Sequence, residues 1–172
     1  MDREDYFISQ MEANKGIILK ISRSFCRTPA DREDLEQEIL LQLWKGLPRY
    51  DPGRAFSTWM YKVALNVAIT HCRAVKKTSG TVPFTESYME VSGEEAPFRD
   101  TESPICLLQA KVAALKELER ALMLLYFEER SYREIAEIMG ITETNVATRI
   151  SRIKEKLKQA ILTEQINRYG RS

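Results

Sequence analysis

The chain has 172 residues and carries 26 basic and 25 acidic side chains, for a formal net charge of +1. This length allows one large domain or two small ones, and no apolar run approaches the length needed to span a membrane. The balanced charge argues neither for nor against a nucleic-acid partner, so the distribution of charge matters more. Basic residues gather at 149–158 and acidic residues at 86–102.

The spacing of the cysteines argues against a metal site, and the absence of known catalytic motifs argues against an enzyme. Cys26, Cys72 and Cys106 are far apart, odd in number and without zinc-type spacing, so we expect reduced thiols that fill core gaps. Phosphate-loop, zinc-protease, nucleophile-elbow and dinucleotide motifs do not occur. The acidic N-terminus does not resemble a signal peptide. These features predict a cytoplasmic protein with no membrane insertion, no metal and no cofactor.

The first two predicted elements are amphipathic helices. Apolar residues at helical spacing predict one helix over 4–26. After Pro29, Asp31 is expected to cap a second helix, with Asp34 in a capping-box-like position. This helix ends at Pro48, and its buried stripe consists of Leu35, Ile39, Leu43 and Leu47. Its other faces are acidic and amide-rich, which suits either solvation or docking of a basic helix.

A turn at 51–53 leads into a third predicted helix over 55–76. We expect its inward face to carry Phe56, Met60, Val63 and Val67, and another face to carry Lys62, Asn66, Thr70 and Arg73. Basic and amide groups beside the rings of Tyr50, Phe56 and Trp59 suit unstacked bases, because rings receive the base while cations hold phosphate. Plain core aromatics are the alternative interpretation of those rings.

Residues 77–103 are predicted to be a flexible linker, because glycines and prolines break any periodicity there. Helical patterning returns after Pro104, first to about Glu117 and then over 119–127. The sequence therefore predicts an all-α chain with a helical domain over 1–76, a linker over 77–103 and a four-helix domain over 104–172.

The last two helices of the second domain have the pattern of a helix-turn-helix. Gly140 is placed to end one helix at positive φ, and Thr142 to cap the next. The second helix would turn Val146, Ile150, Ile153 and Leu157 inward. Its outer face is polar and basic, as in DNA-reading helices, and consists of Asn145, Thr148, Arg149, Arg152 and Lys156. An ordinary helical hairpin is the alternative.

Three segments together resemble a bacterial sigma factor of the sigma-70 class, in the extracytoplasmic-function group. DREDLEQEILLQLW is similar to the segment that docks on core RNA polymerase. YDPGRAFSTWMYKVALNVAITHCR is similar to the segment that melts and reads the −10 element, and YFEERSYREIAEIMGITETNVATRISRIKEKL to the one that reads the −35 element. The segments occur in family order and at family spacing.

The resemblance implies three sets of site residues. It assigns docking on the clamp helices of the largest polymerase subunit to Asp34, Leu35, Gln37, Glu38 and Leu41. It assigns capture of a flipped −10 base to Tyr50, Phe56, Trp59, Tyr61 and Asn66, beside the basic-polar face that adds Lys62, Thr70 and Arg73. It assigns the −35 major groove to Thr144, Asn145, Thr148, Arg149 and Arg152.

The chain departs from the family pattern at two places. Ala147 stands where many members have Lys or Arg, which removes one expected DNA contact. Leu115-Lys116 stands where many have Leu-Pro, so a smoother helix junction is expected there.

The predicted function is that of a promoter-specificity subunit, not an enzyme. It would bind core polymerase, direct it through −35 and −10 elements and help to melt the duplex. The resemblance also implies contact with the flap of the second-largest subunit and a possible anti-sigma factor. A stand-alone helix-turn-helix regulator with a sensing or dimerising domain is the alternative, and an enzyme that uses His71 is a third class.

Overall fold

A computed structural model describes residues 2–79 and 103–170, and every regular element in these two ranges is helical. The contacts divide the chain into two compact units, the first containing α1–α3 and the second containing α4, α5, α7 and most of α6. The all-α class is therefore confirmed. Most of the predicted linker lies outside the described residues, and the domain boundaries stay predictions.

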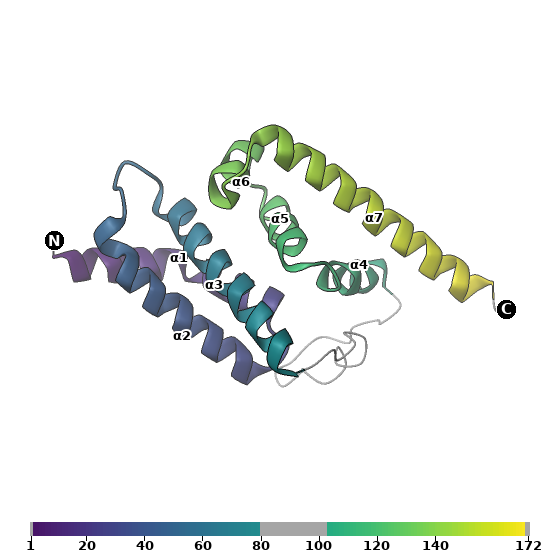
Figure 1. The fold of residues 1–172 in the computed structure, drawn as a ribbon, viewed down its shortest axis with the longest axis horizontal. Helices are drawn as coiled ribbons and strands as arrows, with labels where there is room; N and C mark the ends of the chain where they lie inside the picture. The colour runs from purple at the N-terminus through teal and green to yellow at the C-terminus, as the bar shows by residue number, and fades with distance from the viewer. Residues whose placement is uncertain (1, 80–102, 171–172) are drawn as a thin grey trace. The chain divides into compact units, whose positions relative to one another are not determined.

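The first unit consists of α1 (Arg3–Phe25), α2 (Pro29–Gly46), a short 3-10 turn η1 (Leu47–Arg49) and α3 (Phe56–Ser79). Each of the three long helices packs against the other two, and Figure 1 shows them running side by side. The apolar stripe predicted on the second helix is confirmed, because all four of its residues are buried.

The core face of α3 differs from the prediction. Phe56 and Met60 are buried, whereas Val63 and Val67 are only half-buried. The positions beside them instead fill the core, and they are Tyr61, Ala64, Leu65, Ala68 and Ile69. A helix packed against two others buries a wider face than a single stripe.

The start of α2 also differs from the prediction. Its N-cap is Thr28, whose Oγ1 accepts a hydrogen bond from the Asp31 backbone N–H at 3.1 Å. Pro29 occupies the first turn, where the missing N–H costs nothing. The expected cap Asp31 was therefore wrong, and its carboxylate instead accepts from the Thr28 hydroxyl at 2.7 Å.

The helices after residue 103 are α4 (Pro104–Ala113), α5 (Glu117–Phe127), α6 (Tyr132–Met139) and α7 (Glu143–Tyr169), and all but the end of α6 belongs to the second unit. Helix α7 packs against α4 and α5. Its inward residues Val146, Ile150, Ile153 and Leu157 are all buried, as predicted. It continues to Tyr169, through the residues after Asn167 that the sequence left unassigned.

The junction between α4 and α5 is not smooth, so that expectation was wrong. Lys116 adopts extended backbone with ψ 155°, and its N–H donates to the Glu119 carboxylate at 3.3 Å. The Arg120 guanidinium is buried and donates to the carbonyl oxygens of Ala113 at 2.7 Å and Leu115 at 3.0 Å. This side chain satisfies carbonyls that the break in the helix leaves unpaired.

Candidate nucleic-acid interface

The turn of the helix-turn-helix has the geometry that the sequence predicts. Gly140 has φ +68°, and Thr142 accepts the Asn145 backbone N–H at 3.1 Å. At the start of α6, Ser131 and Glu134 exchange hydrogen bonds: the Ser131 N–H donates to the carboxylate at 2.9 Å, and Ser131 Oγ accepts the Glu134 N–H at 3.2 Å. The first turn of each of the two helices is thus fixed by local hydrogen bonds.

The residues predicted to read the −35 element gather on one face at the start of α7. Thr144, Thr148, Arg149 and Arg152 are exposed, and Asn145 is half-buried. The Arg149 Nε donates to Asn145 Oδ1 at 2.8 Å, and the Thr148 hydroxyl donates to the Thr144 carbonyl at 2.9 Å. This face combines hydroxyl, amide and guanidinium groups at the spacing of one helix surface, which suits the edges and phosphates of a DNA groove.

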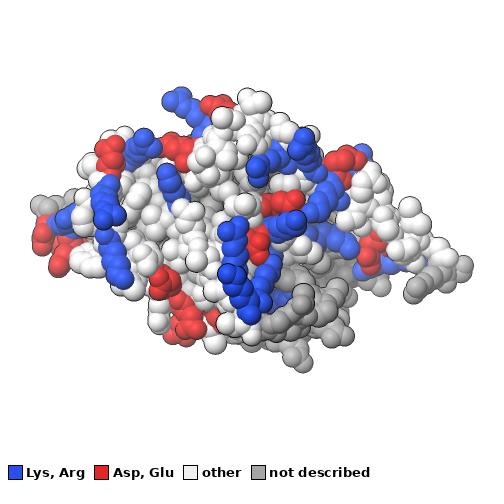
Figure 2. All heavy atoms as spheres, viewed as in Figure 1, with Lys and Arg blue, Asp and Glu red and all other residues white. Residues whose placement is uncertain are grey.

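Two lysines of the basic segment 149–158 form contacts with side chains of α5. Lys154 donates to the Tyr126 hydroxyl at 3.3 Å and lies 5.2 Å from the centre of that ring. Lys156 is exposed, as predicted for the outer face of this helix, and it pairs with Glu119 of α5 at 3.0 Å. Charges of both signs alternate over the visible surface (Figure 2), consistent with the near-zero net charge.

The first unit holds an aromatic cluster where the sequence predicts capture of a base. Ring centres lie 5.3 Å apart for Tyr50 and Phe56, 5.0 Å for Tyr50 and Trp59, and 5.2 Å for Phe56 and Trp59. Phe56 is buried, while Tyr50 and Trp59 are half-buried. Phe56 thus packs against Tyr50 and Trp59 from the core side, and the rings of Tyr50 and Trp59 reach the surface.

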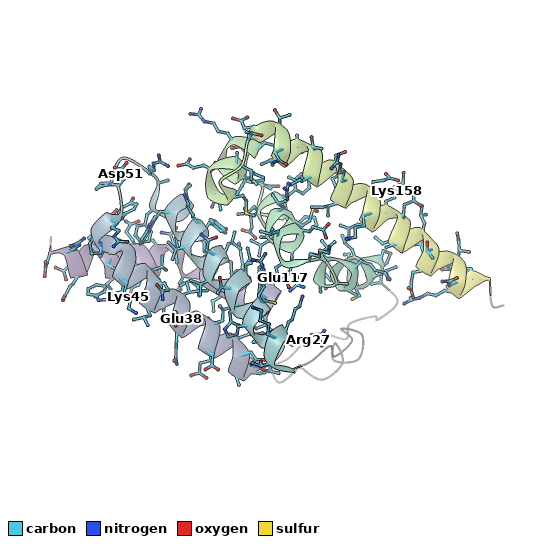
Figure 3. The ribbon with its side chains drawn as sticks, in the orientation of Figure 1. Arg27, Glu38, Lys45, Asp51, Glu117 and Lys158 are labelled. Carbon is cyan, nitrogen blue, oxygen red and sulfur yellow. The ribbon has the colours of Figure 1, made fainter. Side chains whose placement is uncertain are left out.

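The loop above this cluster is closed by hydrogen bonds. The Tyr50 hydroxyl donates to the Arg54 carbonyl at 2.6 Å, and the Gly53 N–H donates to the Asp51 carboxylate at 2.9 Å. Burial and a hydrogen bond with Tyr6 raise the pKa of Tyr50 to about 12. The Tyr50 side chain is therefore a neutral tether for the loop, and Asp51 lies on that loop in Figure 3.

Tyr6 is a member of this cluster that sequence reasoning missed. Its ring meets Phe56 edge-on at 6.2 Å between centres. The contact joins the first turns of α1 to the start of α3, and no periodic pattern relates segments so far apart. The only available signal was an aromatic residue beside Phe7 at the N-terminus.

The basic-polar face predicted on α3 is present. Lys62, Asn66, Thr70 and Arg73 are all exposed and recur at intervals of three or four residues. Tyr61, by contrast, is 1% exposed. Its ring is therefore part of the core beneath this face, and the four exposed residues offer the hydrogen-bonding groups.

The predicted docking residues lie along α2. Asp34, Gln37, Glu38 and Leu41 are exposed, and Leu35 is buried. Leu40 and Trp44, which sequence reasoning did not select, are 42% and 45% exposed beside them. Figure 3 shows Glu38 and Lys45 projecting away from this helix. The face thus combines acidic groups with exposed apolar side chains.

The surroundings of Cys26 and His71 do not suggest a catalytic or metal-binding role. Burial, with Asp31 nearby, raises the pKa of the Cys26 thiol to about 12, which makes it a poor nucleophile. His71 is half-buried within α3, and over the two described ranges no three His, Cys, Asp or Glu side chains gather as a metal would require. No helix in these ranges combines the length and the apolarity needed to cross a bilayer.

Comparison with family models matches both units. Residues 11–78 match sigma-70 region 2, and residues 107–157 match sigma-70 region 4. The first match contains α2 and all of α3 but its last residue, and the second contains the helix-turn-helix through Leu157. Tyr6 and the end of α7 lie outside the matched residues.

Individual relatives agree with the family models. The chain is 27% identical to the ECF RNA polymerase sigma factor SigW of Bacillus subtilis, over 92% of this chain and 90% of that one. It is 27% identical to the RNA polymerase sigma-H factor of Pseudomonas aeruginosa, over 84% and 80% of the two chains.

Two solved structures share the fold. The sigma factor RpoE in complex with the anti-sigma factor NepR, from Bartonella quintana, aligns with TM-score 0.69 at 18% identity, over 90% of this chain and 96% of that one. CnrH in complex with the cytosolic domain of CnrY aligns with TM-score 0.66 at 18% identity, over 93% and 90%.

Proposed function

This chain belongs to the sigma-70 family, in its extracytoplasmic-function group, and directs RNA polymerase to promoters; we propose that its two units divide promoter recognition between them. It is an initiation subunit that binds core polymerase and promoter DNA, not an enzyme in its own right. The observation that carries the proposal is the match of both halves, in order, to the two family regions.

We assign the −35 element to the outer face of α7 and the −10 element to the first unit. In α7, the exposed Thr144, Thr148, Arg149 and Arg152 with Asn145 offer groove and phosphate contacts. In the first unit, Tyr50 and Trp59 wall the place where an extruded base would stack, and the exposed face of α3 holds the strand beside it. Stacking of a base on such rings returns about 1–3 kcal/mol of the cost of unstacking it.

We assign docking on the clamp helices to the exposed face of α2. Asp34 and Glu38 supply negative charge for a basic partner, and Leu41 supplies apolar contact area. Leu35 supports this face from the core. The domain division at 1–76, 77–103 and 104–172, contact of the second unit with the polymerase flap and control by an anti-sigma factor belong to the same proposal. So does action in the cytoplasm, where RNA polymerase works.

In vitro transcription on genomic promoter fragments tests this function. Core polymerase is assayed with and without the purified chain, and start sites that appear only with the chain support the proposal and reveal its −35 and −10 elements. If core polymerase never initiates specifically while the chain alone protects a palindromic duplex, a stand-alone regulator replaces it. A variant Glu38→Lys should lose activity at low concentration and recover when the chain is in excess, because docking is weakened rather than DNA reading.

A further inference from the structure

The first turns of α1 form a fixed base for the side chain of Tyr6. The Asp2 carboxylate caps α1 by accepting the Arg3 N–H, and the Tyr6 N–H donates to the Asp2 carbonyl at 3.0 Å. The adjacent Phe7 is buried, and its ring centre lies 5.3 Å from that of Trp44 on α2. The backbone at Tyr6 is therefore held in place, although Tyr6 precedes the residues that match sigma-70 region 2.

The hydroxyl group of Tyr6 begins a chain of hydrogen bonds that ends in the loop before α3. The Tyr50 hydroxyl donates its single hydrogen to the Arg54 carbonyl at 2.6 Å. Tyr6 also forms a hydrogen bond with Tyr50, and Tyr6 is the donor because Tyr50 has no second hydrogen to give. The Tyr50 hydroxyl thus has one partner on α1 and one on the loop, and hydrogen bonds in such a chain strengthen one another.

The ring of Tyr6 supports the same region through Phe56. The two rings meet edge-on, with their planes at 88° and their centres 6.2 Å apart. The ring of Phe56 in turn lies 5.3 Å from that of Tyr50. Tyr6 therefore restrains Tyr50 twice, directly through its hydroxyl and indirectly through the ring of Phe56.

The loop that Tyr50 closes has internal bonds that shape its turn. Residues 51–55 are all exposed. The Gly53 N–H donates to the Asp51 carboxylate at 2.9 Å, and the Arg54 N–H donates to the Asp51 carbonyl at 3.1 Å. These bonds join the loop to itself and do not fix its place on the first unit, whereas the contacts of Tyr6 tie it to α1.

We propose that Tyr6 is a positioning residue for capture of the extruded −10 base, because it holds the Tyr50 ring and the loop in the arrangement that receives the base. Tyr50 and Trp59, whose ring centres lie 5.0 Å apart, are the half-buried rings that would wall this base. A side chain that is held in place before binding loses less entropy when the base stacks on it. This inference rests on the function proposed above, in particular on the assignment of the −10 element to the first unit.

The test uses the holoenzyme reconstituted from core polymerase saturated with the full chain, on a promoter that the parent chain recognises. Templates lack one base at a time on the non-template strand of the −10 element, so that an abasic sugar remains at that position. With the parent chain, initiation should fall at one position more than at its neighbours, and this position identifies the captured base.

Tyr6→Phe removes the hydroxyl group and keeps the ring. On the intact template it should lower initiation by about 2- to 10-fold, the range for one net hydrogen bond. On the template that lacks the captured base, Tyr6→Phe and the parent chain should initiate equally, because the loop has no base to receive. Tyr6→Leu also removes the ring contact, so it should show a larger loss on the intact template and again no loss on the abasic one.

Ile21→Val is the matched control for a loss of stability in the same helix. Ile21 is 0% exposed and lies about 22 Å farther along α1 than Tyr6. Tryptophan fluorescence during urea unfolding measures how far each variant is destabilised. A purely structural effect of Tyr6 would resemble that of Ile21→Val, which should change initiation on both templates by the same factor.

Two results would overturn the inference while the proposed function stands. One is a Tyr6→Phe chain that initiates as well as the parent chain on the intact template. The other is a loss that is equally large on the template without the captured base. If no abasic position lowers initiation by the parent chain, the assigned capture of a base by the first unit fails, and this inference fails with it.

Discussion

The two units place their candidate residues differently with respect to their own cores. In the second unit the predicted −35 residues lie on the outside of α7, and a separate set of apolar residues on its inside holds the fold. In the first unit, the predicted docking and −10 residues include both core and surface side chains. Leu35, Phe56 and Tyr61 are buried, whereas Leu41, Trp59 and Lys62 reach the surface. Function and stability should therefore separate in the second unit and be coupled in the first.

The largest expected effect is a loss of stability when a buried leucine of α2 is truncated, in comparison with an exposed leucine of the same helix. Leu35 is 0% exposed, so Leu35→Ala should destabilise the first unit by about 2–5 kcal/mol. Leu41 is 44% exposed, and Leu41→Ala should change stability by less than about 1 kcal/mol while weakening binding to core polymerase. Both tryptophans of the chain, Trp44 and Trp59, lie in the first unit, so urea unfolding followed by tryptophan fluorescence measures this unit selectively.

Binding of Leu41→Ala to core polymerase supplies the second measurement for this pair. If Leu35→Ala unfolds at the same urea concentration as the parent chain, the coupling of core and docking face on α2 is refuted. If Leu41→Ala binds core polymerase as tightly as the parent chain, the assigned docking face is wrong.

A second comparison uses two glycines that both have room for an added Cβ but differ in backbone conformation. A Cβ added at Gly140 or at Gly16 would meet nothing within 4 Å, yet Gly140 has φ +68° and Gly16 lies inside α1. Gly140→Ala should cost the helix-turn-helix about 1–2 kcal/mol through backbone strain. Gly16→Ala should stabilise the first unit by about 0.5–1 kcal/mol, because alanine loses less entropy in a helix.

Far-UV circular dichroism during unfolding reports both glycine changes, whereas tryptophan fluorescence should respond only to Gly16→Ala. Equal effects of the two substitutions on stability would show that the sign of φ does not govern these sites.

A third comparison concerns the threonine caps, which have the same geometry in the two units. Thr28 and Thr142 each accept the backbone N–H three residues later at 3.1 Å. Replacement of either by Ala should cost about 1 kcal/mol, and replacement by Ser should cost much less. Thr142→Ala should also weaken discrimination between −35 sequences, because it loosens the start of α7, and Thr28→Ala should not. In vitro transcription on matched −35 templates distinguishes the two, and an equal loss of discrimination in both would contradict separate reading by the two units.

The sequence predicted the helices well, because strong apolar periodicity and turn residues agreed at most positions. Gly140 and Thr142 carry their turn chemistry locally, so both were predictable. The cap of α2 was missed, because Asp31 and Asp34 imitate a capping box while Pro29 conceals that the helix has already begun. The break between α4 and α5 depends on a buried arginine that reaches back five and seven residues, and helical periodicity carries no signal for that contact.

The candidate site was predictable to different degrees in the two units, for a related reason. On α7 a helix that buries one stripe leaves the opposite face open, so spacing predicted the exposed Thr148, Arg149 and Arg152, whereas Thr144 came from the family resemblance. On α3 a helix that packs against two neighbours buries a broad face, and spacing did not reveal that Tyr61 belongs to it. Tyr6 joins the aromatic cluster only through tertiary packing.

The smallest expected effect is a pH dependence at the start of α6. Hydrogen bonds from the Ser131 backbone N–H and side chain, with nearby Arg130, hold the pKa of Glu134 below its ordinary value. Because the folded-state pKa is the lower one, the carboxylate contributes stability above the unfolded pKa of about 4.3 and loses that contribution as the pH falls through the folded value. Glu134 is partly exposed, so screening keeps the contribution below about 0.5 kcal/mol. Urea unfolding of the parent chain and of Glu134→Gln should therefore differ slightly at neutral pH and converge in acid, whereas a gap that widens in acid would reverse the assigned direction.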